Sequence, residues 1–577
     1  MSVQAAQPLA QSLVQSVDWL AVAPPTLAAL AGLAVLVADL FVPDSRKALL
    51  GPAAVAGLAL AALSLLPLVG EDRSTFCLTG DASACAYTAD TFTLAVQFLV
   101  LGGALLAALL SLTALRDADR GLPEGEYWFL LLSSAAGAAL LPAARDLATL
   151  IVALEVASLP AFALVGLRRG DRRSSEAALK FFLSSVTATA VSLLGVSFLY
   201  ATTGTLHLTR LAERVQHVDG QFATLTQTGV VLTLVGFAFK TAAVPFHFWV
   251  PDTYVGAPLP VAAYLSVVGK AVGFSGLILV TVVALPSYAD AWGPALAVLA
   301  ALTMTVGNVA ALRQVTTRAF SAVRLLAWSS VGQAGYLLVP IAAAGYSDDP
   351  GRAVGSTVAY ALMYAAVNLG AFTVAALVGR GRPRNRVADY RGLYTAHPLT
   401  ALLMAFFLLC LAGLPPGVIG LFAKVTVFSA AVDAGLGWLA AVMAANVVIA
   451  LFYYLQWTAL LFRAPAPGGA TAPGGTAGST GTGSGTGTGT GSGTGTGTGS
   501  GTGTGSGDAE GSPVGVGAGS AAATPPGAGA GNAAGVRAAV LRLPAPLTAA
   551  LAVTAVAAVV LSGAPQLVLR FAGGGLF

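Results

Sequence analysis

The chain has 577 residues, of which 56% are hydrophobic and only 9% are charged, and its mean hydropathy is +0.80. This composition excludes a water-soluble protein of this size. The net charge of +4 gives no support to nucleic-acid binding. The four histidines are scattered and the three cysteines form no CxxC pair, so a metal or iron–sulfur centre in this chain has no support either.

Apolar segments recur along the whole chain and predict about fourteen membrane-spanning helices. A hydrocarbon layer about 30 Å thick requires roughly 20 apolar residues per helix, and continuous apolar runs favour helices over strands. The sequence therefore predicts an all-α polytopic membrane protein. The expected spans fall near residues 20–42, 48–69, 89–114, 127–144, 147–167, 177–201, 229–250, 258–284, 294–312, 319–343, 353–379, 399–432, 436–462 and 543–562.

Basic residues in the loops predict the orientation of these spans. One set of alternate loops, including 168–173 and 380–391, carries most of the loop arginines. Because positively charged loops stay in the cytoplasm, both termini are expected outside it. The N-terminus lacks the features of a cleaved signal peptide, so the first span is expected to remain. Cys77 and Cys85 share one outer loop, where a disulfide or two free thiols are both open.

A low-complexity segment precedes the last expected span. Residues 464–536 consist mainly of Gly, Thr, Ser, Ala and Pro, including runs such as GTGTGTGSGTG. Such a segment has too little apolar surface to form a core, so we expect a disordered linker. Its glycines lack the strand–loop–helix context of a phosphate-binding loop.

Four of the five lysines lie inside apolar segments, namely Lys180, Lys240, Lys270 and Lys424. A charged side chain at the centre of a bilayer costs at least about 2.5–3.5 kcal/mol, so such residues usually have a function. Arginine stays charged in proteins, whereas a lysine removed from water can release its proton. The preference for lysine in these segments predicts groups that load and release protons.

Glu155 is the only acid deep inside an expected span, and the next span carries Lys180. Opposite charges on consecutive antiparallel helices could pair. However, Glu155 lies about 20 Å and Lys180 about 10 Å from the intervening loop, at 1.5 Å per residue. Direct contact would therefore require a water, a kink or the reach of the lysine, and a purely structural ion pair is the alternative.

Prolines interrupt two of the lysine-bearing spans. Pro245 follows Lys240, and Pro415 and Pro416 precede Lys424. Proline removes a helical hydrogen bond, and freed backbone groups at membrane depth require water or protein partners. The two broken helices are the fourth of spans 4–8 and the fourth of spans 9–13, which predicts two inverted five-helix repeats with sites near the midplane.

Other polar residues accompany these lysines. His247 lies just past the first break and is a candidate proton relay, or else a histidine that only binds backbone at a helix end. Lys270 lies midway along its span among small residues. Arg324 is expected to extend to the membrane interface. Polar residues follow it that could hold water or simply join helices, namely Ser329, Ser330, Gln333 and Tyr336.

The segment PFHFWVPDTYVGAPLPVAAYLSVVGKAVGF (245–274) resembles the antiporter-like membrane subunits of respiratory complex I. LIVALEVASLPAFALVGL (150–167), LLAWSSVGQAGYLL (325–338) and LAGLPPGVIGLFAKVTVF (411–428) extend the resemblance over residues 120–462. The PDTYVGAP form, a lysine at 270 and the end after the fourteenth span resemble subunit N of this family most. Subunit L would continue into a long lateral helix.

This resemblance implies a fold of fourteen helices with two inverted repeats, helices 4–8 and 9–13, in which helices 7 and 12 are broken. The implied segments are helices 1–3 (1–119), the first repeat (120–290), the second repeat (291–463), the linker (464–536) and helix 14 (537–577). The resemblance also implies a proton path. Its expected members are Glu155, Lys180, Lys240, Lys270 and Lys424, with His247 as a candidate relay. The sequence departs from the family pattern at Gln333, where many relatives carry a histidine, so only hydrogen bonding is expected there.

The expected function is proton translocation in a bacterial NADH:quinone oxidoreductase of the plasma membrane. The resemblance implies that NADH, FMN, iron–sulfur clusters and quinone bind to partner subunits, and that other membrane-arm subunits and lipid surround this chain. Two alternatives remain open. One is a subunit of a multi-subunit cation/proton antiporter, and the other is a structural subunit that does not conduct.

Overall fold

The computed structural model describes residues 17–78, 81–117, 122–464, 544–573 and 576. Nearly all of the predicted linker 464–536 therefore lies outside the described residues. In the remainder, helices dominate, and twelve of them are long and apolar enough to cross a membrane. The predicted polytopic helical membrane protein is confirmed at this level.

The N-terminal part contains three long helices, which begin where the sequence supplies turn and cap residues. Pro24 and Pro25 occupy the first turn of α1, and the Asp90 side chain accepts a hydrogen bond from the Thr93 amide at the start of α3. A 3₁₀ turn, Asp44–Leu49, joins the first two helices. The helices are α1 (Ala23–Phe41), α2 (Leu50–Leu63) and α3 (Thr91–Arg116).

A two-stranded hairpin, which the sequence analysis did not predict, separates α2 from α3 in an otherwise helical structure. Strand β1 (Arg73–Leu78) pairs antiparallel with β2 (Asp81–Ala89), and a disulfide joins Cys77 to Cys85 across the pair. The loop between the two spans is long enough to fold back on itself, and its sequence lacks the long apolar run that marks a membrane helix. The disulfide left open by the sequence is therefore present.

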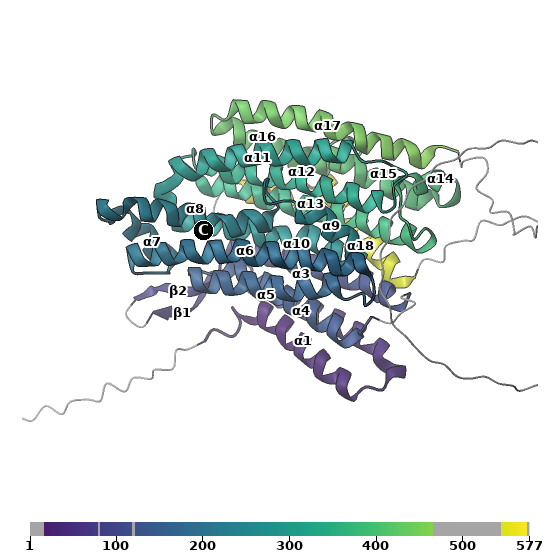
Figure 1. Cartoon of the computed structure of the whole chain (residues 1–577), viewed down its shortest axis with the longest axis horizontal. Coiled ribbons are helices and arrows are strands. Elements are labelled where there is room, and N and C mark those ends of the chain that lie inside the picture. The colour runs from purple at the N-terminus through teal and green to yellow at the C-terminus, as the bar shows by residue number, and fades with distance from the viewer. Residues whose placement is uncertain (1–16, 79–80, 118–121, 465–543, 574–575, 577) are drawn as a thin grey trace, which may run out of the picture. The chain divides into compact units, whose positions relative to one another are not determined.

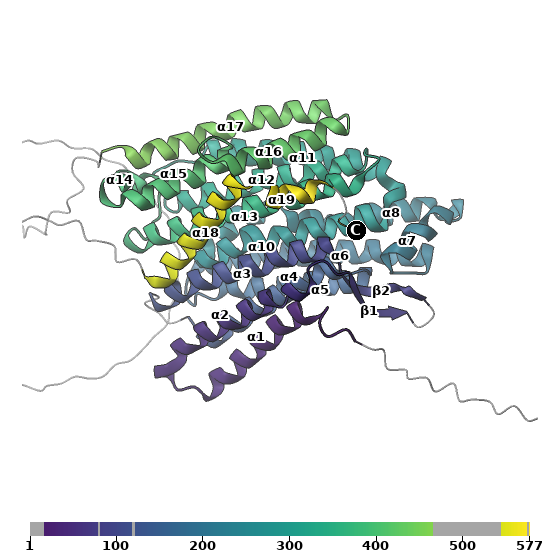
Figure 2. The same ribbon diagram turned by 180° about the vertical axis from the view of Figure 1, so that it is seen from behind.

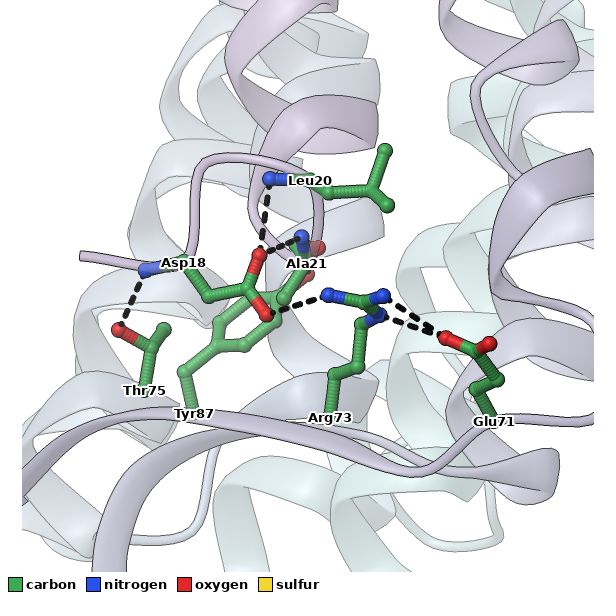
Figure 3. A network of polar contacts seen from close by, with 7 residues as sticks. All are labelled: Asp18, Leu20, Ala21, Glu71, Arg73, Thr75 and Tyr87. Carbon is green, nitrogen blue, oxygen red and sulfur yellow. Dashed lines mark hydrogen bonds and ion pairs between the residues drawn. The ribbon is translucent and has the colours of Figure 1, made fainter.

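A polar network attaches this hairpin to the segment before α1 (Figure 3). The Asp18 carboxylate accepts hydrogen bonds from the Leu20 and Ala21 amides and lies 3.1 Å from Nη1 of Arg73, which also binds Glu71. Partial burial raises the pKa of Asp18. The Ala21 amide and the Arg73 guanidinium outweigh this effect and hold the pKa below its usual range.

The next part of the chain supplies helices α4 to α10. Asp146 and Asp171 cap α5 and α6 by accepting backbone amide hydrogen bonds. The helices are α4 (Glu124–Leu140), α5 (Leu147–Gly166), α6 (Arg172–Thr203), the short α7 (Leu208–Arg214), α8 (Ala223–Thr241), α9 (Trp249–Gly256) and α10 (Leu259–Ile278), which continues as a π-helical turn, Leu279–Ala284.

The last part contains helices α11 to α19. Here α11 and α12 pack closely because Gly307 has no side chain. A Cβ atom at this position would come within 2.3 Å of the Gly332 backbone nitrogen. The elements are α11 (Ala289–Leu312), α12 (Ser321–Ala344), α13 (Pro350–Gly381), the short α14 (Leu393–Ala396), α15 (Pro398–Ala412), α16 (Val418–Asp433), α17 (Gly437–Phe462), α18 (Ala545–Gly563) and the short α19 (Gln566–Leu569).

Helices α10, α12 and α13 form the centre of the bundle. In their most apolar stretches, 89% of α10 and 94% of α12 residues are buried, against 28% for α1 and α18. α10 packs against α3, α8 and α13, while α13 also contacts α12, α15 and α16 (Figure 1). α18, yellow in Figure 2, lies across α3, α13 and α16, so it joins early and late segments of the sequence.

Candidate functional site

Lys240 lies in the last turn of α8 and is only 3% exposed. Its Nζ donates a 2.7 Å hydrogen bond to Oγ of Ser158 on α5. It also lies 5.9 and 5.4 Å from the ring centroids of Phe162 and Phe181, close enough for cation–π attraction. One hydroxyl and two aromatic rings thus hold a cation that would otherwise lack solvation.

The chain beyond Lys240 breaks as the proline pattern predicts. α8 ends with Ala242 in a left-handed conformation (φ 68°), and α9 begins at Trp249. Side chains replace some of the lost helical hydrogen bonds, since Val244 donates its amide to Thr303 and Trp249 donates its indole N–H to the Phe239 carbonyl. His247 lies within this break.

His247 is half-buried, and its ring centroid lies 5.6 Å from that of Trp328 on α12. The histidine lies in the segment between α8 and α9. Its role as a proton relay stays a prediction.

Glu155 is half-buried on α5, and its Oε1 accepts a 2.6 Å hydrogen bond from Thr189 of α6. Lys180, on the same helix as Thr189, binds other acids, Glu176 at 2.8 Å and Asp252 at 2.9 Å. Within the described residues, the direct contact considered between Glu155 and Lys180 is therefore not formed. The reason is the depth difference between the two side chains along their helices.

Asp252 on α9 is the partner that sequence reasoning missed for Lys180. Its second oxygen lies 3.3 Å from Nη1 of Arg324 on α12, so one carboxylate connects α6, α9 and α12. Arg324 thus has a specific acidic partner in addition to its position near the helix end. The Lys180 side chain is 46% exposed, unlike the other three lysines of the apolar segments.

Lys270 lies midway along α10 and is 3% exposed. Its Nζ has no hydrogen-bond partner among the residues that the structure describes. One turn earlier on α10, Ser266 accepts a 2.7 Å hydrogen bond from Asn368 of α13. A buried amine without a protein partner is suited to bind water or to exchange a proton.

Lys424 lies on α16 beyond the second break and is 5% exposed. Its Nζ donates to the carbonyl oxygen of Ala412, the last residue of α15, and lies 5.6 Å from the Tyr336 ring centroid. Gly413 ends α15 with φ 84°, and a Cβ atom there would lie 2.9 Å from Cδ of Lys424. Glycine therefore lets the lysine approach the broken end of the helix.

A cavity lies beside Lys424, with about 20 Å³ of room for the centres of water molecules. Its polar wall consists of Gln333, Tyr360, Tyr364 and Lys424. The Tyr360 hydroxyl donates to the Gln333 side-chain oxygen, and the Tyr364 hydroxyl lies 3.0 Å from Ser330. The two tyrosines were not singled out from the sequence, because buried tyrosine is common in helix interfaces.

No group of three or more His, Cys, Asp or Glu side chains in the described part of the chain could hold a metal ion. The site instead consists of separate amines, each enclosed by apolar helices. Such an arrangement defines a polytopic membrane protein with buried amines, a residue type that is typical of proton-exchanging sites in membranes.

Comparison with known proteins gives the family. Residues 144–450 match the family described as NADH:quinone oxidoreductase/Mrp antiporter, TM. A relative from Streptomyces griseus, NADH-quinone oxidoreductase subunit N 2, is 67% identical over 98% of this chain and 96% of its own length. Subunit N from Salinispora tropica is 46% identical over 79% of this chain and 87% of its own length. The chain belongs to this family.

A solved structure agrees with this assignment. A chain of respiratory complex I from Thermus thermophilus matches with a TM-score of 0.66 and 27% sequence identity, covering 96% of this chain and all of that chain. The resemblance to the antiporter-like subunits, and to subunit N among them, is confirmed.

Proposed function

We propose that the chain is the subunit N-type, proton-translocating membrane subunit of a bacterial NADH:quinone oxidoreductase. The observation that carries the proposal is the enclosure of Lys240, Lys270 and Lys424 inside the bundle of a chain whose 67% identical relative is named NADH-quinone oxidoreductase subunit N 2. NADH, FMN, iron–sulfur clusters and quinone bind to partner subunits. Other membrane-arm subunits and lipid surround this chain.

The proposed proton path uses the residues that the sequence singled out. Lys240 accepts a proton from the cytoplasmic side near the α8–α9 break, where His247 is a candidate relay. Glu155 and Lys180 influence the proton affinity of Lys240 through their charges. Glu155 is held by Thr189, and Lys180 is held by Asp252. Lys270 passes the proton laterally, and Lys424 releases it on the outer side.

The proposed architecture has fourteen membrane helices. It adds α4, with 17 residues, and the broken pair α15–α16 to the twelve long apolar helices. α4 to α10 form one five-helix repeat (120–290) and α11 to α17 the inverted second repeat (291–463), with α8–α9 and α15–α16 as their broken members. Helices 1–3 (1–119), the linker (464–536) and the last helix (537–577) complete the proposed segments.

The proposed orientation places both termini outside the cytoplasm, in the plasma membrane of a bacterium. The arginine-rich loops 168–173 and 380–391 support this orientation. The disulfide between Cys77 and Cys85 supports it independently, because disulfides persist on the oxidising side of a membrane.

The test uses the assembled oxidoreductase in sealed vesicles, with NADH-driven proton flux measured beside quinone reduction. Lys240→Met and Glu155→Gln should abolish coupled proton flux while the complex still assembles. The matched control is Lys47→Met, because Lys47 is the one lysine outside the apolar segments and binds Asp39 and Asp44 at the surface.

Unchanged flux in Lys240→Met and Glu155→Gln would refute their roles. Sodium-dependent proton flux that requires no NADH would instead favour a cation/proton antiporter. Full coupling after Lys240, Lys270 and Lys424 are neutralised together would favour a structural subunit that does not conduct.

A further inference from the structure

The space between α10 and α16 contains tyrosine hydroxyls that the proposed lysine path does not use. Tyr364 of α13 donates to the Ser266 carbonyl oxygen of α10 at 3.2 Å, and its hydroxyl lies 3.0 Å from Ser330 of α12. The same side chain lines the cavity beside Lys424. One hydroxyl therefore contacts α10 and α12, and the ring borders the space that adjoins α16.

Tyr360 lies one turn away on α13 and lines the same cavity. Its hydroxyl donates to the Gln333 side-chain oxygen, and Gln333 also donates to Tyr454 of α17 at 3.3 Å. An amide oxygen accepts hydrogen bonds but does not titrate, so Gln333 holds the Tyr360 hydroxyl in place rather than carrying a proton itself.

The cavity has room for a water molecule. A void needs about 10–15 Å³ of space for water centres and two to four polar partners before water occupies it. This cavity provides about 20 Å³, and the polar residues that line it are Gln333, Tyr360, Tyr364 and Lys424. A water here would lie between hydroxyl groups and the lysine.

Lys270 on α10 is the second buried amine near Tyr364. This lysine follows Ser266 by one turn of α10, at the place where Tyr364 and Asn368 of α13 reach that helix. The buried Nζ of Lys270 makes no hydrogen bond to any described residue, so it is available to a water molecule. The polar groups thus extend from the neighbourhood of one buried amine to the next.

We propose that Tyr364 and Tyr360, joined by water in this cavity, relay protons between Lys270 on α10 and Lys424 on α16, with Gln333 positioning Tyr360. The first transfer breaks an N–H bond of the Lys270 ammonium and forms an O–H bond on the next group of the relay, which leaves a neutral amine on Lys270. At each hydroxyl, a new O–H bond forms as the original O–H bond breaks, so the tyrosine stays neutral. The last transfer forms an N–H bond on the neutral amine of Lys424. The hydroxyls then rotate back before the next proton arrives. This proposal rests on the proposed function of the lysines.

The experiment compares Tyr360→Phe, Tyr364→Phe and the double variant in the assembled oxidoreductase reconstituted in vesicles. Phenylalanine keeps the ring and removes only the hydroxyl. The double variant should lower NADH-driven proton flux about tenfold. A positioned acid–base group contributes about 10²–10⁴-fold, but water can partly replace a missing hydroxyl, so the expected decrease is smaller.

The solvent isotope effect is a second readout, which distinguishes the loss of a proton relay from a change in side-chain packing. If proton relay becomes rate-limiting, the solvent deuterium isotope effect on turnover should increase in the double variant and in Gln333→Met. The control is Tyr127→Phe. Tyr127 on α4 is equally buried, and its hydroxyl lies 2.7 Å from the Ser111 hydroxyl, with none of the four lysines as its partner. The flux and isotope effect of this variant should match those of the wild type.

Two outcomes distinguish the relay from the lysine path. Wild-type flux and isotope effect in the double variant, with flux abolished in Lys424→Met, would overturn the relay alone. Wild-type flux in Lys424→Met as well would overturn both. If the double variant fails to assemble, the two single variants carry the same comparison, each expected to show a smaller decrease and a raised isotope effect.

Discussion

The Lys424 amine donates a hydrogen bond to the carbonyl oxygen of Ala412, the residue at which α15 ends. A helix end leaves carbonyl groups without helical partners, and at membrane depth these must be satisfied by other groups. The break before α16 therefore provides an acceptor for the lysine, and the lysine in turn satisfies the broken helix.

Gly413→Ala should disturb this arrangement. Gly413 has φ 84°, a region that costs other residues about 1–2 kcal/mol, and the added Cβ would crowd Cδ of Lys424. We expect a lower thermal stability of the complex and reduced coupled proton flux. Gly437→Ala is the control because its Cβ would meet open space. Equal behaviour of the two variants would contradict the close approach.

Ser158→Ala should weaken the site of Lys240. The Ser158 hydroxyl is the hydrogen-bond acceptor of the buried Lys240 amine, and loss of such a partner typically costs about 1–3 kcal/mol. Unfolding and coupled flux are both measured. Ser275→Ala is the control, because among the described residues the buried Ser275 hydroxyl binds only backbone oxygens of its own helix. A fall in flux no larger than that of Ser275→Ala would argue against the role of Ser158.

A double-mutant cycle measures the ion pair of Lys180 with Asp252. Both side chains are more than a third exposed in the isolated chain, so the coupling energy should be about 0–1 kcal/mol and should decrease at high salt. Thermal unfolding of Lys180→Met, Asp252→Asn and the double variant provides the cycle. A coupling above about 3 kcal/mol is typical of buried pairs and would contradict this geometry.

Stability of the N-terminal segment should depend on the charge of Asp18. The pKa of Asp18 is lowered in the folded state, so its stabilising contribution is present above the unfolded value of about 3.9 and is lost as the pH falls through the folded pKa. Protection of the Leu20 and Ala21 amides from hydrogen exchange should therefore decrease at acidic pH. Asp18→Asn should remove this pH dependence, and its persistence in that variant would assign the effect to another group.

The disulfide offers a test of orientation. A membrane-impermeant maleimide added to intact cells should label Cys77 and Cys85 only after mild reduction, because the pair is oxidised and the hairpin is proposed to lie outside the cytoplasm. Buried Cys410 serves as the internal control and should stay unlabelled. Labelling that requires permeable cells would reverse the proposed topology.

The sequence predicted the features that follow from composition and local chemistry. Apolar length located the helices, and the prolines located both breaks. The rarity of charge in apolar segments identified four lysines, of which Lys240, Lys270 and Lys424 are buried and Lys180 is half exposed. The partners Ser158, Thr189 and Asp252 were not predicted. Helices that are apolar on every side give no periodic signal of their rotation, so which side chains meet depends on packing.

The hairpin was missed for a different reason. Its strands lie in a short stretch between two strong helical signals. They are joined by a disulfide and bound to Asp18, which lies far away in the sequence. The relay proposed for Tyr360 and Tyr364 likewise depends on α12, α13 and α16 meeting around one cavity.

The nearly complete enclosure of α10 and α12 has a consequence for how this protein responds to its membrane. α1 and α18 leave most of their surface uncovered by this chain, whereas the two central helices are almost entirely covered by it. Changes in bilayer thickness or fatty-acid composition should therefore alter the outer helices first, while the surroundings of Lys270 stay insulated from them. Insulation of this kind would let one sequence serve an organism whose lipids vary with growth temperature.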